Sequence, residues 1–368
     1  MKLPSERRLM HLKTLQLHFF RNYESASFEF SEQVNCVLGD NGSGKTNLLD
    51  AVYYLALTKS ATQSKDELNI KHEERLMALH GSFSKKEKEE LISLSMIRGQ
   101  AKALLHDKKP YTKKSEHIGK YPVVLIAPDD TDMIRDASDT RRKLFDGIIA
   151  QADSSYLDDF QKYNRLVDQR NKLLKQFAEQ NYFDQSMLDT YDEQLVPLAI
   201  SLAEKRRSFI KDFSPLVQKH YEEISSGKEA ITLDYQTVVE ADFGKKLKQN
   251  QWKDRQANRT TIGIHKDDYA FDFDGVSFKK YASQGQKKSL VMAVKMAQFD
   301  LLHEIKEVKP ILLLDDIFDK LDDHRIAMLV QKIGNGDFGQ VFISDARPER
   351  TRGFIEGLNL DVRYFFTS

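Results

Sequence analysis

The stretch Gly39 to Thr46, "GDNGSGKT", constrains the fold more than any other part of these 368 residues. It matches the pattern G-x-x-x-x-G-K-[ST], and it follows an apolar strand pattern and precedes an amphipathic helix pattern. Such a loop curls its backbone N–H groups around phosphate, and its glycines permit that curl. We expect Lys45 to reach the β- and γ-phosphates and Thr46 to place its hydroxyl on Mg²⁺. The predicted phosphate-binding residues are Gly39, Asp40, Asn41, Gly42, Ser43, Gly44, Lys45 and Thr46. A chance glycine loop is the alternative, and both flanking elements argue against it.

A second motif, "PILLLDDIFDKLD" at 310–322, supplies the carboxylates that such a loop needs. Four apolar residues precede Asp315 and Asp316, as in a buried strand of a parallel sheet, and ligands bind at the carboxyl ends of such strands. We predict that Asp315 holds Mg²⁺, directly or through water. Asp316 is then the candidate base for the attacking water, so Asp316 and Lys45 are the predicted catalytic residues. An ordinary solvated Asp pair is the alternative.

A third motif comprises Ser283, Gln284, Gly285 and Gln286, a polar loop directly before an apolar helical pattern. The N-terminus of a buried helix can hold an anion through its backbone donors and its dipole. A plain helix cap at Ser283 is an equally simple interpretation, because Ser is a common cap residue.

Composition excludes several classes. No stretch approaches the roughly 18 apolar residues of a membrane span, and the single cysteine, Cys36, cannot form an internal disulfide. We therefore expect a cytoplasmic protein without a membrane partner. The 56 basic and 56 acidic residues balance, so net charge predicts no nucleic-acid partner.

Together the three motifs, in this order, resemble the ATPase heads of the ABC superfamily, in the branch that contains the SMC proteins and the RecF family. "LQLHFFRNYESASFEF" (15–30), "YNRLVDQRNKLLK" (163–175) and "GIHKDDYAF" (263–271) are similar to RecF-family segments, and the similarity covers nearly the full length. It implies an α/β, ABC-type P-loop ATPase head with an inserted, mainly helical lobe. We expect the head to comprise 1–150, with the phosphate loop, and 256–368, with the other two motifs. The lobe is expected at 151–255.

The resemblance also implies roles for residues. The Ser283–Gln286 segment is expected to cap the γ-phosphate held by a second, identical subunit, so that ATP joins a homodimer. Asp129, in "APDDTDM" (127–133), or its neighbour Asp130 would sense the metal. Arg21 and Asn22 are candidates to lie against the adenine, and a surface turn is an equally good interpretation of them.

As a member of this family, the chain is expected to be a weak ATPase that uses ATP and Mg²⁺ as a switch. It would bind gapped or junction DNA and help RecR, with RecO in some pathways, to load RecA during repair, replication restart and the SOS response. An SMC-like DNA-organising ATPase is disfavoured, because the inserted lobe is too short for long heptad arms. A transporter ATPase subunit should carry a Q-loop glutamine and a switch histidine, which are not evident. A stand-alone ATPase in phage defence stays open.

The DNA-contacting residues are not predicted. Residues 151–260 contain 17 basic and 18 acidic residues, so the lobe is not a basic domain. Three local basic runs exist, and each is more often a solvated helix face than a phosphate contact. They are Arg141–Lys143, Lys205–Arg207, and Lys245 and Lys246 with Lys248.

Overall fold

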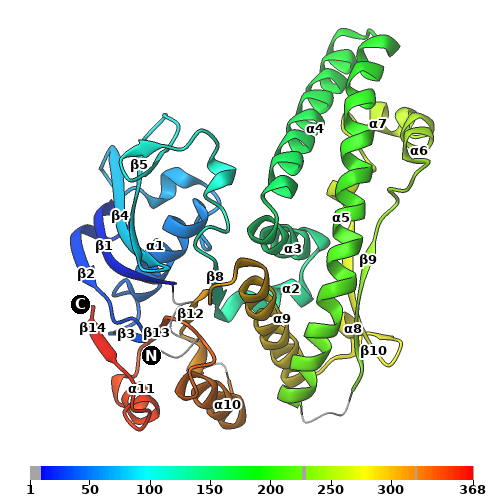
Figure 1. Ribbon diagram of the computed structural model, residues 1–368. Coiled ribbons are helices and arrows are strands. Elements are labelled where there is room, and N and C mark those ends of the chain that lie inside the picture. The colour runs from blue at the N-terminus through cyan, green and yellow to red at the C-terminus, as the bar shows by residue number, and fades with distance from the viewer. Residues whose placement is uncertain (1–9, 226–228, 320, 368) are drawn as a thin grey trace. The chain divides into compact units, whose positions relative to one another are not determined.

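The computed structural model describes residues 10–225, 229–319 and 321–367 (Figure 1). The chain folds into two compact units. The first unit combines Met1–Asp130 with Val294–Ser368, and the second is Thr131–Ala293. Within the described part of the chain, no helix combines the length and the apolar composition that a membrane crossing requires.

A five-stranded parallel sheet lies at the centre of the first unit. Its strands, in spatial order, are β14 (Val362–Phe366), β3 (Val34–Leu38), β13 (Val341–Asp345), β12 (Ile311–Asp315) and β8 (Val123–Ile126). Every residue of β3, β12 and β13 is buried, as expected for strands covered on both faces. Because the strands are parallel, the residues that follow them meet at one edge of the sheet. This edge carries all the predicted phosphate and metal residues of the unit except Arg21 and Asn22.

A six-stranded antiparallel sheet forms the other half of the first unit. Its order is β2 (Tyr23–Glu29), β1 (Met10–Phe20), β4 (Leu76–Lys85), β5 (Lys88–Ile97), β6 (Ala103–His106) and β7 (Lys109–Pro110). The shorter helices of the unit are α10 (Asp323–Gly334) and α11 (Pro348–Ile355), with 3₁₀ turns at Asp66–Asn69, Lys114–Glu116, Pro128–Thr131 and Ile317–Asp319.

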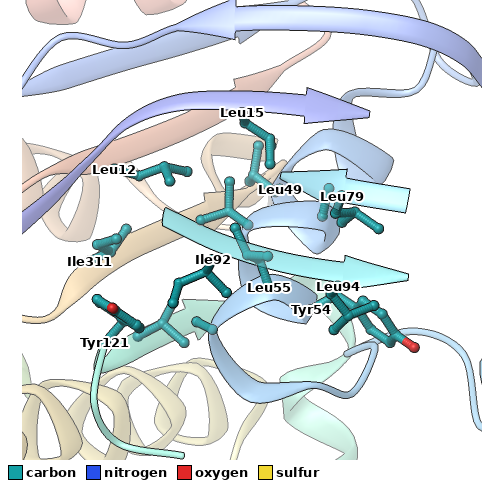
Figure 2. Packing of buried hydrophobic residues seen from close by; sticks show 14 of the residues in the cluster. Leu12, Leu15, Leu49, Tyr54, Leu55, Leu79, Ile92, Leu94, Tyr121 and Ile311 are labelled. Atoms are coloured by element: carbon teal, nitrogen blue, oxygen red, sulfur yellow. The ribbon is translucent and has the colours of Figure 1, made fainter. Parts of the chain in front are cut away.

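Helix α1 (Lys45–Leu57) packs against strands of both sheets, and their side chains form one apolar core (Figure 2). Leu12, Leu79 and Ile92 come from the antiparallel sheet, Leu55 comes from α1, and Ile311 comes from the parallel sheet. The contact at β4 is close, because a Cβ added at Gly81 would lie 2.3 Å from Leu55 Cδ2. This packing fixes the helix that begins at the predicted phosphate loop.

The second unit is mainly helical, as expected. Its helices are α2 (Asp132–Arg135), α3 (Ser138–Ala152), α4 (Ser154–Gln180), α5 (Gln185–Ser225), α6 (Phe243–Gln249), α7 (Gln251–Ala257) and α8 (Phe278–Tyr281). Helix α9 (Gln284–Lys306) begins in this unit and ends in the first. A small antiparallel sheet joins β11 (Val276–Ser277), β10 (Asp268–Phe273) and β9 (Ile231–Gln236), and a 3₁₀ turn spans Ile264–Lys266. Figure 1 shows α4 and α5 side by side along most of their length.

A buried arginine holds the second unit together. Arg206 on α5 is 0% exposed, and its guanidinium donates to both carboxylate oxygens of Asp146 at 2.8 and 2.9 Å and to Asp267 Oδ2 at 3.2 Å. The expectation of a solvated helix face is therefore wrong at Arg206. Arg141 is also buried and donates to both oxygens of Asp268 at 2.7 and 2.9 Å.

The second unit extends beyond the expected lobe at 151–255 in both directions. The bond from Arg141 on α3 to Asp268 on β10 accounts for part of this, because it ties residues before 151 to residues after 255. Gln286 on α9 likewise donates to Glu229 Oε1 at 2.5 Å. The Ser283–Gln286 segment thus falls in the second unit.

Candidate phosphate-binding site

The loop between β3 and α1 has the glycine geometry that the motif predicts. Gly44 has φ of 102°, in the left-handed region, and a Cβ there would lie 2.3 Å from Asn22 Nδ2. A Cβ on Gly39 would lie 2.3 Å from the carbonyl oxygen of Thr367. Larger residues at either position would collide with the wall of the loop. Asp40, Asn41 and Gly42 form its exposed crest.

Lys45 lies inside this loop. Its side chain is folded against the backbone, and Nζ donates to the carbonyl oxygens of Gly39 at 3.0 Å and Asp40 at 2.9 Å. The residue is 3% exposed, so a positive charge is held largely out of water with two neutral partners. Burying a charge on such terms is unfavourable unless an anion compensates it. The loop is therefore built to receive a negative group.

Thr46, Asp315 and Ser344 form a chain of hydrogen bonds at the same edge. Thr46 Oγ1 donates to Asp315 Oδ1 at 3.0 Å, and Ser344 Oγ donates to the same oxygen at 2.6 Å. The Asp316 N–H in turn donates to Ser344 Oγ at 2.9 Å. The hydroxyl of Thr46 and the carboxylate of Asp315 are oxygen ligands of the kind Mg²⁺ prefers, and both stand at the mouth of the loop. These residues fit the predicted metal site.

The carboxylate of Asp316, unlike its backbone N–H, takes no part in this chain of hydrogen bonds. Its backbone has φ of 45°, which is uncommon outside glycine, and its buried Oδ1 has no hydrogen-bond partner among the described residues. Burial raises the pKa of Asp316, and the carboxylates of Asp315 and Asp345 raise it further, whereas the charge of Lys45 lowers it. Burial also raises the pKa of Asp315, against the Ser344 and Thr46 hydroxyls and Lys45. A cation would relieve this crowded pair.

No three His, Cys, Asp or Glu side chains in the described segments gather into a self-sufficient metal cluster. That pattern suits Mg²⁺, which is usually held by one or two carboxylates together with substrate phosphates and water. Asp129, the third predicted metal residue, is exposed in the turn after β8, at the same edge of the sheet. Its neighbour Asp130 is engaged elsewhere, since Lys295 Nζ lies 2.7 Å from its Oδ1.

Arg21 and Asn22 contact the first turn of α1, directly after the loop, through Asn47. The Arg21 guanidinium donates to Asn47 at 2.8 Å and Asn69 at 3.0 Å and forms an ion pair with Asp50. Asn22 accepts from Asn47 at 2.7 Å. Arg21 is thus committed to fixing α1 and the segment after it, and the adenine contact of these two residues stays a prediction.

Thr367 and Tyr23 were not predicted, yet both touch the loop. Thr367 Oγ1 lies 2.6 Å from Ser43 Oγ, and Tyr23 Oη donates to the Gly44 carbonyl at 3.1 Å. Thr367 follows β14, which pairs with β3, so only the strand order of the sheet brings it here. Tyr23 lies in segment 15–30, which resembles a segment of the RecF family. Its hydroxyl group, next to Arg21 and Asn22, was the one feature that could have indicated a contact with the loop.

The Ser283–Gln286 segment forms a reciprocal helix cap. The Ser283 N–H donates to Gln286 Oε1 at 2.6 Å, and the Gln286 N–H donates to Ser283 Oγ at 3.2 Å. This is a capping box at the start of α9. Arg135 also donates to Gln284 Oε1 at 2.6 Å. Ser283, Gln284 and Gly285 remain exposed, so the cap interpretation holds and leaves the surface of the segment accessible.

Comparison with known proteins places these features in a family. The family model described as the RecF/RecN/SMC N terminal domain matches residues 11–354. The "DNA replication and repair protein RecF" of Flavobacterium johnsoniae is 43% identical over 357 residues, which cover 97% of this chain and 99% of that protein.

Solved structures agree. A structure described as the recombination mediator protein RecF-ATPrS in the RecFOR pathway superposes with a TM-score of 0.88 at 26% identity, covering 98% of each chain. The Smc head domain of Pyrococcus furiosus superposes with a TM-score of 0.53 at 16% identity, covering 97% of this chain and 93% of that one. The second similarity concerns the ATPase-head fold alone.

Proposed function

Because this chain belongs to the RecF family of DNA replication and repair proteins, we propose that it is an ATP-dependent DNA-binding recombination mediator. On this proposal ATP joins two copies of the chain on gapped or junction DNA, and the dimer helps to load a recombinase. The observation that carries the proposal is the buried Lys45, whose polar partners are two carbonyl oxygens in a loop built for phosphate.

ATP is the proposed ligand of this loop. The backbone from Gly39 to Thr46 would surround the phosphates, and Lys45 would exchange its two carbonyl partners for phosphate oxygens. Related proteins support this choice, since the structures of RecF are described with ATP and an ATP analogue.

Mg²⁺ would be held by Thr46 and Asp315, with Asp129 as a further candidate, and would screen the charge of the phosphates. Asp316 is the proposed base. Its unpartnered Oδ1 and its raised pKa suit a group that accepts a proton from water. Because aspartate is a short side chain, we expect hydrolysis to be slow and to act as a switch.

Ser283 to Gln286 would act across the dimer. These residues belong to the second unit, whereas the phosphate loop belongs to the first. Their exposed surface at the start of α9 offers hydroxyl, amide and helix-end donors to a γ-phosphate that exists only before hydrolysis. ADP lacks that group, so the dimer would separate after hydrolysis.

RecR is the proposed partner, with RecO and RecA in the same process, and cytoplasmic location and an SOS role stay predictions. Co-purification with RecR would separate this proposal from a stand-alone defence ATPase. An SMC-like organising role would instead require long coiled-coil arms. The two longest helices of the second unit, α4 and α5, have only 27 and 41 residues.

The test is retention of the protein on gapped DNA with ATP, with ADP and without nucleotide. We expect ATP-dependent retention, slow hydrolysis, and longer retention for Asp316→Asn, in which hydrolysis falls about 100-fold or more. The matched control is Asp323→Asn, which changes an exposed carboxylate in the first turn of α10 outside the predicted site. Equal retention with ATP and ADP would overturn the proposal, and unchanged turnover in Asp316→Asn would assign the base elsewhere.

A further inference from the structure

The end of the second unit where α4 stops and α5 begins contains a cavity of about 470 Å³. Figure 1 shows α7 and α6 beside this end of the two long helices. Leu174 and Phe177 on α4 are buried beneath the cavity, whereas Tyr182 and Trp252 line it and are 54% and 57% exposed. Exposed aromatic side chains that share one cavity, rather than standing singly on a surface, mark a candidate binding site.

The helices next to this cavity are strongly basic. Residues 243–259 contain six basic residues and one acidic residue, Asp254, which is 0% exposed and paired with Arg170 at 2.8 Å. Lys246 pairs with Glu240 and Asp242. The other five basic residues are exposed, and none lies within ion-pair distance of a carboxylate in the described chain: Lys245, Lys248, Lys253, Arg255 and Arg259. The uncompensated positive charge of this surface favours binding of an anion.

Cations and rings are combined at the cavity itself. The Arg255 guanidinium carbon lies 3.9 Å from the centre of the Phe183 ring, and Lys253 Nζ lies 5.5 Å from that of Trp252. Tyr182 Oη donates to Asp184 at 3.1 Å, which fixes its position. Asp184 is itself occupied at the start of α5, where it accepts from the Ser186 N–H at 2.8 Å.

We propose that this cavity binds unpaired bases of single-stranded DNA, with Tyr182 and Trp252 stacking on the bases and Lys253, Arg255 and Lys248 contacting phosphates. Base stacking on exposed aromatic residues beside a basic groove is how many proteins hold single strands without reading sequence. An acidic peptide would also match the positive charge. The two exposed rings favour single-stranded DNA instead, because each of its nucleotides carries a planar base that can stack on an aromatic ring. The inference rests on the proposed DNA-binding function. It adds where on the second unit DNA binds and that the bound DNA is single-stranded.

Trp252 is the only tryptophan in the chain and therefore reports directly on the site. The test is quenching of its fluorescence when oligo(dT) is added to the full-length protein without nucleotide. We expect oligo(dT) to quench the emission, an abasic oligonucleotide of equal length to bind about tenfold more weakly without quenching, and an acidic peptide to leave the emission unchanged.

Variants give an independent readout by fluorescence anisotropy of labelled oligo(dT). Tyr182→Ala and Trp252→Ala should each weaken binding about tenfold, whereas Trp252→Phe should bind almost as wild type because it keeps a ring. Lys253→Ala should also flatten the salt dependence. The control is Lys88→Ala, an exposed lysine of the first unit, which should change nothing.

Equal quenching by the abasic oligonucleotide, quenching by the peptide alone, or unchanged affinity in both alanine variants would overturn the proposal. These results are distinguishable from failure of the proposed function. If ATP-dependent retention on gapped DNA persists while the quenching is absent, only the single-strand site is lost. If retention fails and the quenching is present, the site stands without the ATP switch.

Discussion

Two buried cations, one in each unit, hold their charge in opposite ways. Arg206 in the second unit is surrounded by carboxylates, with Asp146 bonded by both oxygens and Asp267 at 3.2 Å. Lys45 in the first unit is nearly as buried, yet its hydrogen bonds go to two backbone carbonyls. Arg206 is therefore bonded directly to its counter-ions, whereas Lys45 bonds only to carbonyl oxygens and acts on the carboxylates of Asp315 and Asp316 through space.

This difference separates a structural cation from a binding one. Removing one partner of a compensated buried pair leaves the remaining charges stranded, so it damages stability. Removing Lys45 breaks hydrogen bonds to two carbonyl groups and takes away a charge that acts on Asp315 and Asp316 only through space, so the main loss should appear when a phosphate ligand arrives. The following substitutions test the contrast, from the largest expected effect to the smallest.

Arg206→Met should lower the free energy of unfolding of the second unit by about 3–5 kcal/mol, because Asp146 and Asp267 would stay buried without their cation. Urea unfolding followed by circular dichroism measures this. The neighbouring Arg207 is exposed, so Arg207→Met should lower it by less than about 1 kcal/mol. Equal effects of the two substitutions would contradict the structural role of Arg206.

Lys45→Ala should weaken ATP binding about 100-fold or more, because a charged hydrogen-bonding group in a dry loop is lost. Its free energy of unfolding should stay within about 1 kcal/mol of wild type. Calorimetric titration and urea unfolding measure the two quantities. Lys45→Arg keeps the charge and should retain part of the affinity while impairing turnover, because a planar fork replaces a compact ammonium. Wild-type ATP affinity in Lys45→Ala would remove the basis of the site.

Asp316→Asn should raise the melting temperature of the nucleotide-free protein by a few °C at pH 7. Burial raises the pKa of Asp316, so the ionised carboxylate opposes folding above that pKa, and the amide removes this effect. The gain should disappear as the pH falls through the raised pKa, because the wild-type carboxyl then becomes neutral. Asn also tolerates the left-handed backbone at this position.

Thermal unfolding of both proteins at pH 7 and at pH 4 measures this pH dependence. A variant that is less stable than wild type at pH 7, or equally stabilised at both pH values, would contradict the unfavourable burial of Asp316.

Local patterns in the sequence predicted the parts of the molecule that depend on neighbouring residues. The phosphate loop before α1 and the strand that ends at Asp315 are both present. The alternative of a helix cap at Ser283 was equally visible, because its partner Gln286 is three residues away. Such features follow from spacing alone.

Features that depend on distant partners could not be predicted in this way. Arg206 lies in a basic run that looks solvated, and its partners Asp146 and Asp267 are 60 and 61 residues away. Thr367 lies 324 residues from Ser43 and reaches the loop only through the strand order. The break between α4 and α5 at 181–184 was missed as well, although Asn181 ends α4 in the left-handed conformation that Asn tolerates.

The central claim, that ATP joins two copies of this chain through Ser283, is tested most directly by measuring particle mass with light scattering. Asp316→Asn chains, which should not hydrolyse ATP, should have twice the 42.6 kDa chain mass with ATP and the single mass with ADP. Adding Ser283→Arg should leave ATP affinity nearly unchanged and keep the protein at the single mass, because the bulky cation would obstruct the donors at the start of α9. A doubled mass in the Ser283→Arg protein, or loss of its ATP affinity, would contradict the account.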